Sequence, residues 1–461
     1  MVRSSLVLIV FLQLASLCSP ARQIHFATAI NTNSGLSGPG SVAIGDFNRD
    51  GLLDVVITDH VSTLSVLLGL GNGTFNSPVT YTLDSFVSNQ VAVAEFNGDG
   101  IADLAVVEGG LTVPSTLAVL LGNGDGTFGS PTYYSTSIDG AGLSLAIGDL
   151  NHDGILDIFL GGAGASTVLL GDPGGGFHEG QFQSVSGFWI AEGDFNDDGN
   201  LDVALTGGIN QNISVLLGNG DGTFQAPVSY SGGNDPIGIV SADFNHDKKL
   251  DLATAAFNDT AVDVLLGNGD GTFGTGREWA AGTQPTTLVA SDFNRDHNID
   301  LAVADDGQGG VDVLAGKGDG TFLRGSFFAT GKNATFVAPG DFNNDGSVDL
   351  VVTNDGDNTV SVLLNAAGTN VALTSSMNPS HVGQAVTFTA TVAATVSTSI
   401  PTGTVIFKDG MTLLGNASLS NGVAAFTTSG LQQGKHRIVA VYEGDSSFNP
   451  NASAILIQRV R

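Results

Sequence analysis

The sequence predicts an all-β protein in which a seven-bladed β-propeller precedes a smaller β-sandwich. An acidic nine-residue loop of the form D-x-N-x-D-G-x-x-D occurs seven times, at steps of 49, 54, 45, 49, 49 and 49 residues. Apolar and β-branched residues alternate in short runs between the loops, and no helical period is present. The loops begin at Asp46, Glu95, Asp149, Asp194, Asp243, Asp292 and Asp341. A fixed period of about 50 residues indicates a repeat architecture.

Each repeat holds four short strands, which is the composition of a propeller blade. In the fifth repeat the runs P-I-G-I-V-S-A, L-A-T-A-A and A-V-D-V-L-L are separated by the acidic loop and by Asn- and Gly-rich turns. Small residues stand directly before every loop: Gly45, Ala94, Gly148, Gly193, Ala242, Ser291 and Gly340. Two positions earlier stand Ala43, Ala92, Ala146, Ala191, Val240, Val289 and Ala338. Because the innermost strands crowd the central channel, we expect the first strand of each repeat to be innermost.

The ends of the repeat region predict how the ring closes. A turn ending in Phe follows the third strand at Phe75, Phe128, Phe177, Phe224, Phe273 and Phe322. The seventh repeat stops at Leu364-Asn365 without this element, whereas Phe26 lies 20 residues before Asp46. The other repeats place that Phe 17 to 21 residues before the next loop. We therefore predict that residues 24–34 supply the outer strand of the seventh blade.

The loops carry the oxygen donors that calcium prefers. In the first loop Asp46, Asn48 and Asp50 alternate, Leu52 can add its backbone carbonyl, and Asp54 closes the site. The same five roles fall on Glu95, Asn97, Asp99, Ile101 and Asp103; on Asp149, Asn151, Asp153, Ile155 and Asp157; on Asp194, Asn196, Asp198, Asn200 and Asp202; on Asp243, Asn245, Asp247, Lys249 and Asp251; on Asp292, Asn294, Asp296, Asn298 and Asp300; and on Asp341, Asn343, Asp345, Ser347 and Asp349. The alternative is a set of Asx turns without metal, but such turns need one Asp or Asn and not four at alternate positions.

The sequence thus predicts up to seven structural Ca²⁺ sites, with affinities of about 10⁻⁴–10⁻³ M. Gly51 and its counterparts allow the positive φ of a sharp turn, but Lys248 and His297 occupy that position in the fifth and sixth loops. The strain there is roughly 1 kcal/mol or more, so we expect these two sites to be the weakest. Glu95 adds one methylene at the first ligand position of the second loop.

The repeats resemble FG-GAP/VCBS repeats, the blades of the integrin α-subunit head and of many secreted bacterial proteins. The T-F-x-x-P pieces at Thr127–Pro131 and Thr223–Pro227, together with the acidic loops, carry this resemblance over roughly residues 24–365. It implies a calcium-binding propeller that serves recognition or adhesion, without implying one ligand.

Composition limits the partners and the location. Lys and Arg number 15 against 45 Asp and Glu, a formal charge of -30, which disfavours nucleic acid and anionic membranes as partners. Residues 1–21 have the charged start, apolar run and small-residue end of a signal peptide, and Cys18, the single cysteine, lies within it. No later apolar run reaches spanning length, so we expect no membrane insertion. These features predict a secreted, extracellular or cell-surface protein, with the periplasm also possible.

Two other features have simpler explanations than a binding site. The G-N-G-D-G stretches resemble phosphate loops, but they lack the Lys and the following helix, so we interpret them as hairpin turns. Trp279 fills an aromatic position that recurs six residues after five of the six turn Phe residues, at Tyr81, Tyr134, Tyr230, Trp279 and Phe328, which favours packing. Trp189 has only Phe336 as an aligned aromatic and lies near the channel, so it is the better candidate for ligand contact. His152 and His246 do not suggest a zinc site.

Residues 368–461 are predicted to form an Ig-like β-sandwich after the propeller at 22–367. The runs V-T-F-T-A-T-V, G-T-V-I-F-K-D-G and H-R-I-V-A-V-Y alternate as strands, and Asp409-Gly410 marks a hairpin. The pieces N-P-S from Asn378, P-T-G-T-V from Pro401 and Y-E-G-D from Tyr442 resemble bacterial Ig-like repeat domains. Such modules usually act as spacers or adhesion units.

The function predicted is calcium-stabilised recognition or adhesion toward an extracellular glycan or a surface protein. No catalytic signature stands apart from the repeats. A polysaccharide lyase remains the alternative, because some calcium-rich propellers are lyases. It would need a base and a Lys or Arg that converge on one face. A purely architectural surface protein is the third hypothesis.

Overall fold

The computed structural model describes residues 24–84, 88–110, 113–139, 144–207, 212–365, 368–394, 400–445, 448 and 451–461. The predicted signal peptide at residues 1–21 lies outside these ranges. Within them the regular secondary structure is almost entirely strand, and no helix is long and apolar enough to cross a membrane. One short 3₁₀ turn, η2 (Asp355–Asp357), lies in the seventh repeat.

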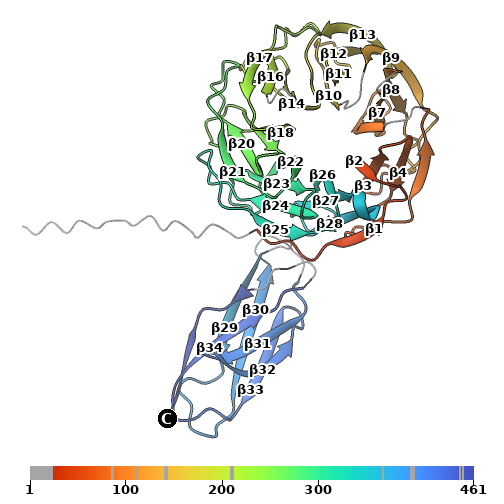
Figure 1. The fold of residues 1–461 in the computed structure, drawn as a ribbon. Coiled ribbons are helices and arrows are strands. Elements are labelled where there is room, and N and C mark those ends of the chain that lie inside the picture. Colours follow the sequence, from red (N-terminus) through yellow and green to blue (C-terminus); the bar gives the residue numbers. More distant parts are fainter. Residues whose placement is uncertain are drawn as a thin grey trace, which may run out of the picture.

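Seven four-stranded antiparallel sheets form the blades of a ring (Figure 1). The first three blades are β2 (Pro39–Gly45), β3 (Asp54–Asp59), β4 (Thr63–Leu67) and β5 (Val79–Thr82); β6 (Ser88–Ala94), β7 (Asp103–Gly110), β8 (Val113–Leu120) and β9 (Thr132–Asp139); and β10 (Ser144–Gly148), β11 (Asp157–Gly161), β12 (Ser166–Asp172) and β13 (Gly176–Gln183). The next three are β14 (Trp189–Gly193), β15 (Asp202–Thr206), β16 (Asn212–Leu216) and β17 (Val228–Ser231); β18 (Pro236–Ala242), β19 (Asp251–Ala256), β20 (Ala261–Leu265) and β21 (Arg277–Ala280); and β22 (Pro285–Ser291), β23 (Asp300–Asp305), β24 (Gly310–Leu314) and β25 (Ser326–Ala329). The first strand of each repeat faces the channel, as predicted.

The seventh blade closes the ring in the predicted way. It is built from β26 (Ala334–Gly340), β27 (Asp349–Asn354), β28 (Thr359–Leu363) and β1 (Ile30–Asn33). The β1 strand pairs antiparallel with β28, from Ile30 opposite Val362 to Asn33 opposite Thr359, and Phe26 forms a bridge with Asn365. The chain segment before the first repeat therefore completes the blade of the last repeat.

The hydrophobic core of the ring lies between neighbouring blades. Seven of the buried clusters in the described residues each join two adjacent blades, and one of them joins the seventh blade to the first. In the interface of the first two blades, for example, Phe47 and Val56 pack with Leu104 and Phe128. Because no blade has a core of its own, each blade depends on both neighbours.

Three of the small residues before the loops, Gly148, Gly193 and Gly340, serve packing between blades, which differs from the crowding of the channel that we expected, whereas Ala94 does line the channel. A Cβ added at Gly340 would lie 2.7 Å from a methyl of Leu53 in the next blade, and a Cβ at Gly193 would collide with Leu250. The residue before each loop is therefore small where the leucine of the next loop packs on it. The alanines two positions earlier, such as Ala92 and Ala191, do line the channel.

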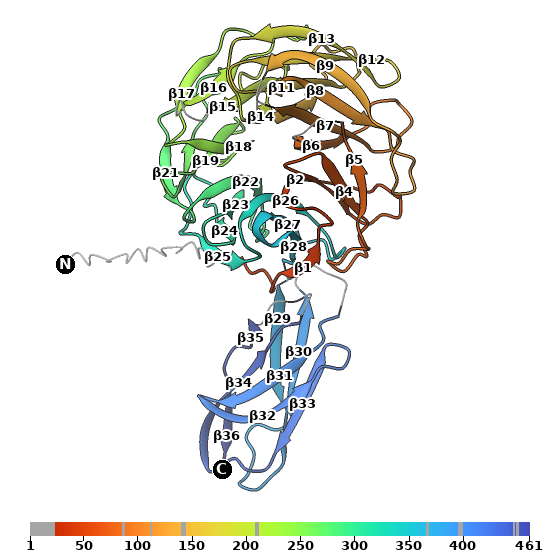
Figure 2. The ribbon, with the colours of Figure 1, turned by 45° about the vertical axis from the view of Figure 1, so that its right-hand side comes forward.

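The second part of the chain forms a two-sheet sandwich (Figure 2). One sheet contains β29 (Thr369–Ser375), β30 (Val386–Ala394) and β33 (Val423–Thr428). The other contains β32 (Thr412–Ser418), β31 (Thr404–Asp409), β34 (Gly434–Tyr442) and β35 (Asn451–Ala452), with β36 (Leu456–Val460) also paired to β34. Phe388, Phe407 and Tyr442 fill the space between the sheets and are fully buried.

Candidate functional site

The acidic loops connect the first and second strands of each blade and share one hydrogen-bond pattern. In the first loop the backbone N–H of Asp50 donates to Asp46 Oδ1 and Asn48 Oδ1, both at 3.0 Å. The N–H of Gly51 donates to Asp46 Oδ2 at 2.9 Å, and that of Leu52 donates to Asp50 Oδ1 at 2.8 Å. The side chains at positions one, three and five thus point into the loop that they form.

Two positions of each loop adopt left-handed backbone conformations. The sixth position was predicted to need positive φ, and φ is 81° at Gly51, 69° at Lys248 and 70° at His297. The two non-glycine residues therefore carry the backbone strain expected of them. The backbone at position four is left-handed as well, which the sequence pattern did not predict. This position is occupied by Arg49, Gly98, His152, Asp197, His246, Arg295 and Asn344.

The second loop differs because its first residue is Glu95. Its Oε1 accepts hydrogen bonds from the backbone N–H groups of Asn97, Gly98 and Asp99. The first residues of the other loops accept from the N–H groups at positions five and six, and Asp243 also accepts from that of Asn245 at position three. The extra methylene therefore moves this carboxylate along the loop.

The closing aspartate of each loop is fully buried and anchors two segments of backbone. Asp202 Oδ2 accepts from the N–H of Phe195 at 2.8 Å, and its Oδ1 accepts from the N–H of Gly218 at 2.7 Å. The first contact holds the loop, and the second holds the turn that follows the third strand. Both contacts recur in all seven loops, at Asp54, Asp103, Asp157, Asp202, Asp251, Asp300 and Asp349.

Only a glycine fits at the position that donates to this aspartate in the blades that have it, because a Cβ there would meet the backbone. A Cβ at Gly218 would collide with the carbonyl oxygen of Leu201, and the same collision occurs in the other blades that have this glycine. The seventh blade has Asn365 at this position.

The surroundings of the closing aspartates disfavour the negative charge of their carboxyl groups. Burial, together with a smaller contribution from the other two acids of the same loop, raises the pKa of Asp300 to about 7 and that of Asp349 to about 8. The two backbone hydrogen bonds act in the opposite direction without cancelling the effect. Three carboxyl groups therefore lie close enough in each loop to repel one another.

The donors of each loop fit a hard cation, since they are three acids, an amide oxygen and a carbonyl. Their oxygens are turned toward backbone N–H groups in this structure. Among the residues with described positions, no three His, Cys, Asp or Glu side chains are arranged to hold a metal ion. Calcium binding by the predicted ligands would thus require the carboxylates to share or exchange these amide contacts.

Neighbouring loops contact one another through the side chain at position four. His152 Nε2 lies 2.9 Å from Asn200 Oδ1, and His246 Nε2 lies 3.0 Å from Asn298 Oδ1. Arg295 donates to the carbonyl oxygen of Gly346 in the same way. Sequence reasoning did not anticipate these contacts, because the partners are about 50 residues apart.

The G-N-G-D-G stretches are turns, as interpreted, and they also link adjacent blades. Within one turn the N–H of Thr223 donates to Asp221 Oδ1 at 3.1 Å. The N–H of Gly222 donates to the carbonyl oxygen of Leu150 in the preceding loop at 2.9 Å. In the seventh blade the side-chain amide of Asn365 makes the equivalent bond to the carbonyl oxygen of Phe293, at 2.7 Å.

The recurring aromatic position is a packing position. Trp279 contacts Phe322 edge to face, with ring centroids 6.0 Å apart, as Tyr230 does with Phe273 at 5.5 Å. Trp189, the better ligand candidate, is half-buried and packs against Phe336 at 4.8 Å. These two residues belong to β14 and β26, in the fourth and seventh blades, so their pair crosses the channel.

A polar cleft of about 430 Å³ lies between the sixth and seventh blades. It is formed by the connections between second and third strands and between successive blades. Because neighbouring strands are antiparallel, these connections lie at the edge opposite the acidic loops. The cleft is lined by Gln284, Asp306, Gly307, Gln308, Gly309, Thr330, Gly331, Lys332, Asn333 and Asp357. Lys332 Nζ lies 3.7 Å from Asp357 Oδ1, so one cation and two acids are present here.

Asp312 is a buried acid outside the loops. It lies in β24 with 8% of its surface exposed, and its Oδ2 has no hydrogen-bond partner. Burial raises its pKa to about 6, and the charge of Asp305 adds to the effect. The corresponding position holds a serine in three other blades: Ser65, Ser214 and Ser361.

We predict that Asp312→Ser raises the free energy of unfolding at pH 7.5 by about 1–2 kcal/mol. The folded-state pKa lies above the ordinary value of 3.8, so the wild type loses stability as the pH rises from that value to about 6. The gain should therefore shrink toward pH 4. Urea unfolding at pH 7.5 and 4.5 measures it, with the exposed Asp84→Ser as control. A gain that is equal at both pH values would contradict this explanation.

Comparisons with known proteins identify both parts of the chain. The model of the FG-GAP-like repeat family matches residues 46–106, 96–160, 194–254 and 292–352, which together exceed half of the chain. The model of the bacterial Ig-like domain (group 3) matches residues 373–461. A search of curated proteins returned no match.

Solved structures support the fold. BBS1N in complex with ARL6DN, from a crystal soaked with lead, is 13% identical, with a TM-score of 0.52 over 74% of this chain and 97% of that chain. The mercury-soaked crystal gives 14% and 0.51 over the same shares. A lectin of Agrocybe aegerita, described as recognising non-reducing terminal N-acetylglucosamine, is 17% identical over 87% of this chain and 99% of that chain. Its TM-score of 0.43 does not establish a shared fold.

Proposed function

This chain belongs to the FG-GAP-like repeat family and ends in a bacterial Ig-like domain, and from this membership we propose that it is a calcium-stabilised recognition protein of the cell exterior. In this proposal the propeller binds a glycan in the polar cleft between the sixth and seventh blades. The Ig-like domain acts as the spacer or surface-facing unit.

The polar cleft is the observation that carries the proposal. Its side-chain amides, Gln284, Gln308 and Asn333, each offer both donors and acceptors, and Asp306 adds an acceptor. A ligand rich in hydroxyl groups can satisfy such a set in a concave site of this size. Lys332 is also one of the few basic residues of the propeller, all of which except Arg22 and Arg49 lie in the fifth to seventh repeats or their borders.

Binding to a glycan array, with calcium and with chelator, tests this proposal. We expect binding to a defined sugar that falls at least about tenfold in Lys332→Ala, since hydrogen bonds to a charged group are worth about 1.5–3 kcal/mol. Lys435→Ala, which removes an exposed charge in the sandwich, is the matched control. Binding that is unchanged in Lys332→Ala would rule out the cleft. No binding to any glycan would favour a protein partner or an architectural role.

A polysaccharide lyase is the second candidate, because Lys332 shares one cleft with Asp306 and Asp357. In a lyase, one acid would remove the proton next to a uronate carboxylate that the lysine neutralises, a carbon–carbon double bond would form as the glycosidic C–O bond breaks, and the leaving oxygen would take up a proton from the other acid or from water. Incubation with uronate-containing polysaccharides would then give unsaturated products, detected by their ultraviolet absorbance. If no such product forms from a polysaccharide that binds, the recognition function stands alone.

Calcium is proposed to hold the acidic loops. It would be bound by the side chains at positions one, three and five, the carbonyl at position seven and the closing aspartate. The raised pKa values of the closing aspartates Asp300 and Asp349 support this proposal, because a divalent cation would offset the repulsion that the neighbouring acids exert on them.

We predict that removal of calcium strongly destabilises the propeller. At a free calcium concentration ten times the dissociation constant, each site contributes about 1.4 kcal/mol, so seven sites contribute about 10 kcal/mol. For a domain of this size the melting temperature should fall by roughly 20 °C in chelator. Thermal unfolding in calcium, in magnesium and in EGTA measures the effect. Equal melting temperatures in all three would exclude structural calcium without bearing on the glycan site.

A further inference from the structure

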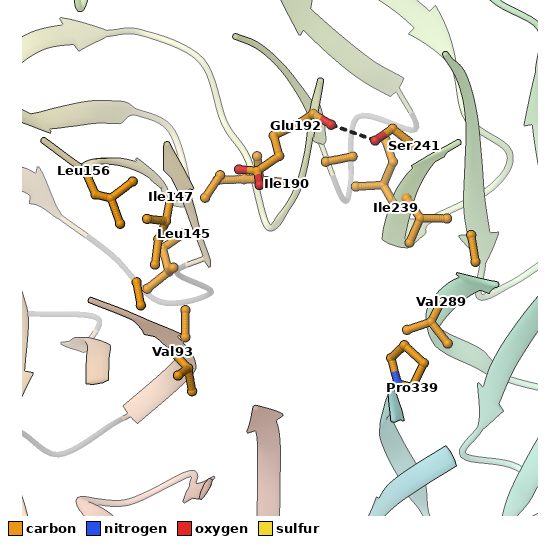
Figure 3. A pocket seen from close by; sticks show the side chains of 16 residues that line it. Val93, Leu145, Ile147, Leu156, Ile190, Glu192, Ile239, Ser241, Val289 and Pro339 are labelled. Carbon is orange, nitrogen blue, oxygen red and sulfur yellow. Dashed lines mark hydrogen bonds between the residues drawn. The ribbon is translucent and has the colours of Figure 1, made fainter. Parts of the chain in front are cut away.

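The central channel of the propeller contains a cavity of about 680 Å³ (Figure 3). Sixteen residues line it, and all of them except Leu156 of the third acidic loop belong to the inner strands of the second to seventh blades. This volume lies within the range of about 300–1,000 Å³ that is usual for small-molecule sites. The cavity is separate from the polar cleft, with which it shares no lining residue.

One end of the channel is crossed by the aromatic pair Trp189 and Phe336. Trp189 is the first residue of β14 and Phe336 lies near the start of β26, and their ring centroids are 4.8 Å apart. The cavity is lined by residues that come later in the same strands, such as Ile190 and Pro339. A ligand would therefore enter from the face that carries the acidic loops.

The lining is apolar apart from two side chains, Glu192 and Ser241. The Ser241 hydroxyl donates to the backbone carbonyl oxygen of Glu192 at 2.6 Å, so its proton is already used. Glu192 is the only charged residue among the sixteen, and Figure 3 shows its position at the channel wall beside Ile190. A single acid, exposed to the channel and hydrogen-bonded to the backbone of Ile147, thus stands among walls of Val, Ile, Leu, Ala and Pro side chains.

We propose that this channel binds an elongated apolar molecule that carries one aliphatic ammonium group, with the ammonium paired to the Glu192 carboxylate. A carboxylate beside apolar side chains is stabilised when a ligand brings an opposite charge close to it and displaces water from around the pair. The apolar body of the ligand would cover the aliphatic wall, which favours binding by about 25 cal/mol per Å² of apolar surface removed from water. A neutral apolar ligand would bring no counter-charge to this carboxylate, whose partner within the protein is the backbone N–H of Ile147.

Dansylcadaverine, an apolar fluorophore on a short primary alkylamine, is a suitable probe. Its control is N-pentyl dansylamide, which has the same body without the amine. Titration is followed by dansyl fluorescence at physiological ionic strength with calcium present. We expect the full chain to bind the amine at least tenfold more tightly than the neutral control.

Three variants test whether the amine binds in the channel or on the acidic surface of the protein. Glu192→Gln should lower affinity for the amine at least tenfold and leave the neutral control unchanged. Glu443→Gln removes an exposed acid of the sandwich and should leave both unchanged. Ala290→Phe narrows the cavity and should weaken both probes. Unaltered melting temperatures would show that the variants fold.

Two results would overturn the proposal. The first is equal binding of the two probes to the wild type, since the ammonium would then contribute nothing. The second is amine binding that survives Glu192→Gln, which would place the amine on the acidic surface instead. Both results are independent of any glycan bound in the polar cleft.

Discussion

Deletion of residues 24–34 is expected to open the ring and to abolish the cooperative unfolding of the propeller. The deletion removes β1 and exposes the edge of β28, whose Val360 and Val362 are fully buried in the closed ring. It also removes Phe26, which is 3% exposed and packs edge to face on Phe293 and Phe328. Loss of such a buried Phe side chain alone costs about 3–5 kcal/mol.

Thermal unfolding and limited proteolysis compare this deletion with a chain that begins at residue 24. Phe26→Ala should give an intermediate loss of about 3 kcal/mol. A synthetic peptide of residues 24–34, added to the deleted chain, should restore the blade by strand addition. If the deleted chain unfolds with the melting temperature of the control, β1 does not hold the ring together.

Asp202→Ala is expected to destabilise the propeller by about 3–5 kcal/mol in chelator, and by more in calcium. The substitution leaves the buried N–H groups of Phe195 and Gly218 without an acceptor, and each such group costs about 1–3 kcal/mol. In calcium the loss should be larger, because a proposed ligand is removed as well. The part of the loss that persists in chelator measures the anchoring of the backbone.

The matched control is Asp221→Ala, which removes the exposed turn aspartate that accepts from Thr223 in the same blade. Chemical unfolding of both variants and of the wild type, with and without EGTA, gives the comparison. If the loss in Asp202→Ala disappears in chelator, the closing aspartate acts only through the metal.

Much of the fold could be predicted because one local pattern is repeated seven times. The strands follow from the alternation of apolar and polar residues, and the blades follow from the period of about 50 residues. The closing strand follows from Phe26, which stands before the first repeat at the spacing expected of the last one. Crowding of the channel was the wrong reason for the small residue at Gly340, because its packing partner is Leu53, which is almost the whole propeller away in sequence. Periodicity identifies which positions are small without identifying what they contact.

The candidate sites were less predictable, because they depend on contacts between repeats. Four oxygen donors at alternate positions indicate calcium, but they do not reveal that the closing Asp202 holds two backbone segments. The pair of Trp189 with Phe336 joins blades that are not neighbours. Likewise, the acid in the channel, Glu192, has no counterpart in the other repeats, and only the closed ring surrounds it with apolar walls.

The hydrogen bonds of Asn365 determine how a pulling force would pass through the molecule. The chain leaves the ring at this residue, shortly before the sandwich begins at Thr369. Its backbone N–H is bonded to Asp349, and its side-chain amide to the carbonyl oxygens of Phe293 and Val348. When the sandwich is tethered and the propeller is held by a ligand, the pull runs along β28, which is paired on both sides. Several hydrogen bonds would then have to break together in shear, so the seam where the ring closes would bear the mechanical load.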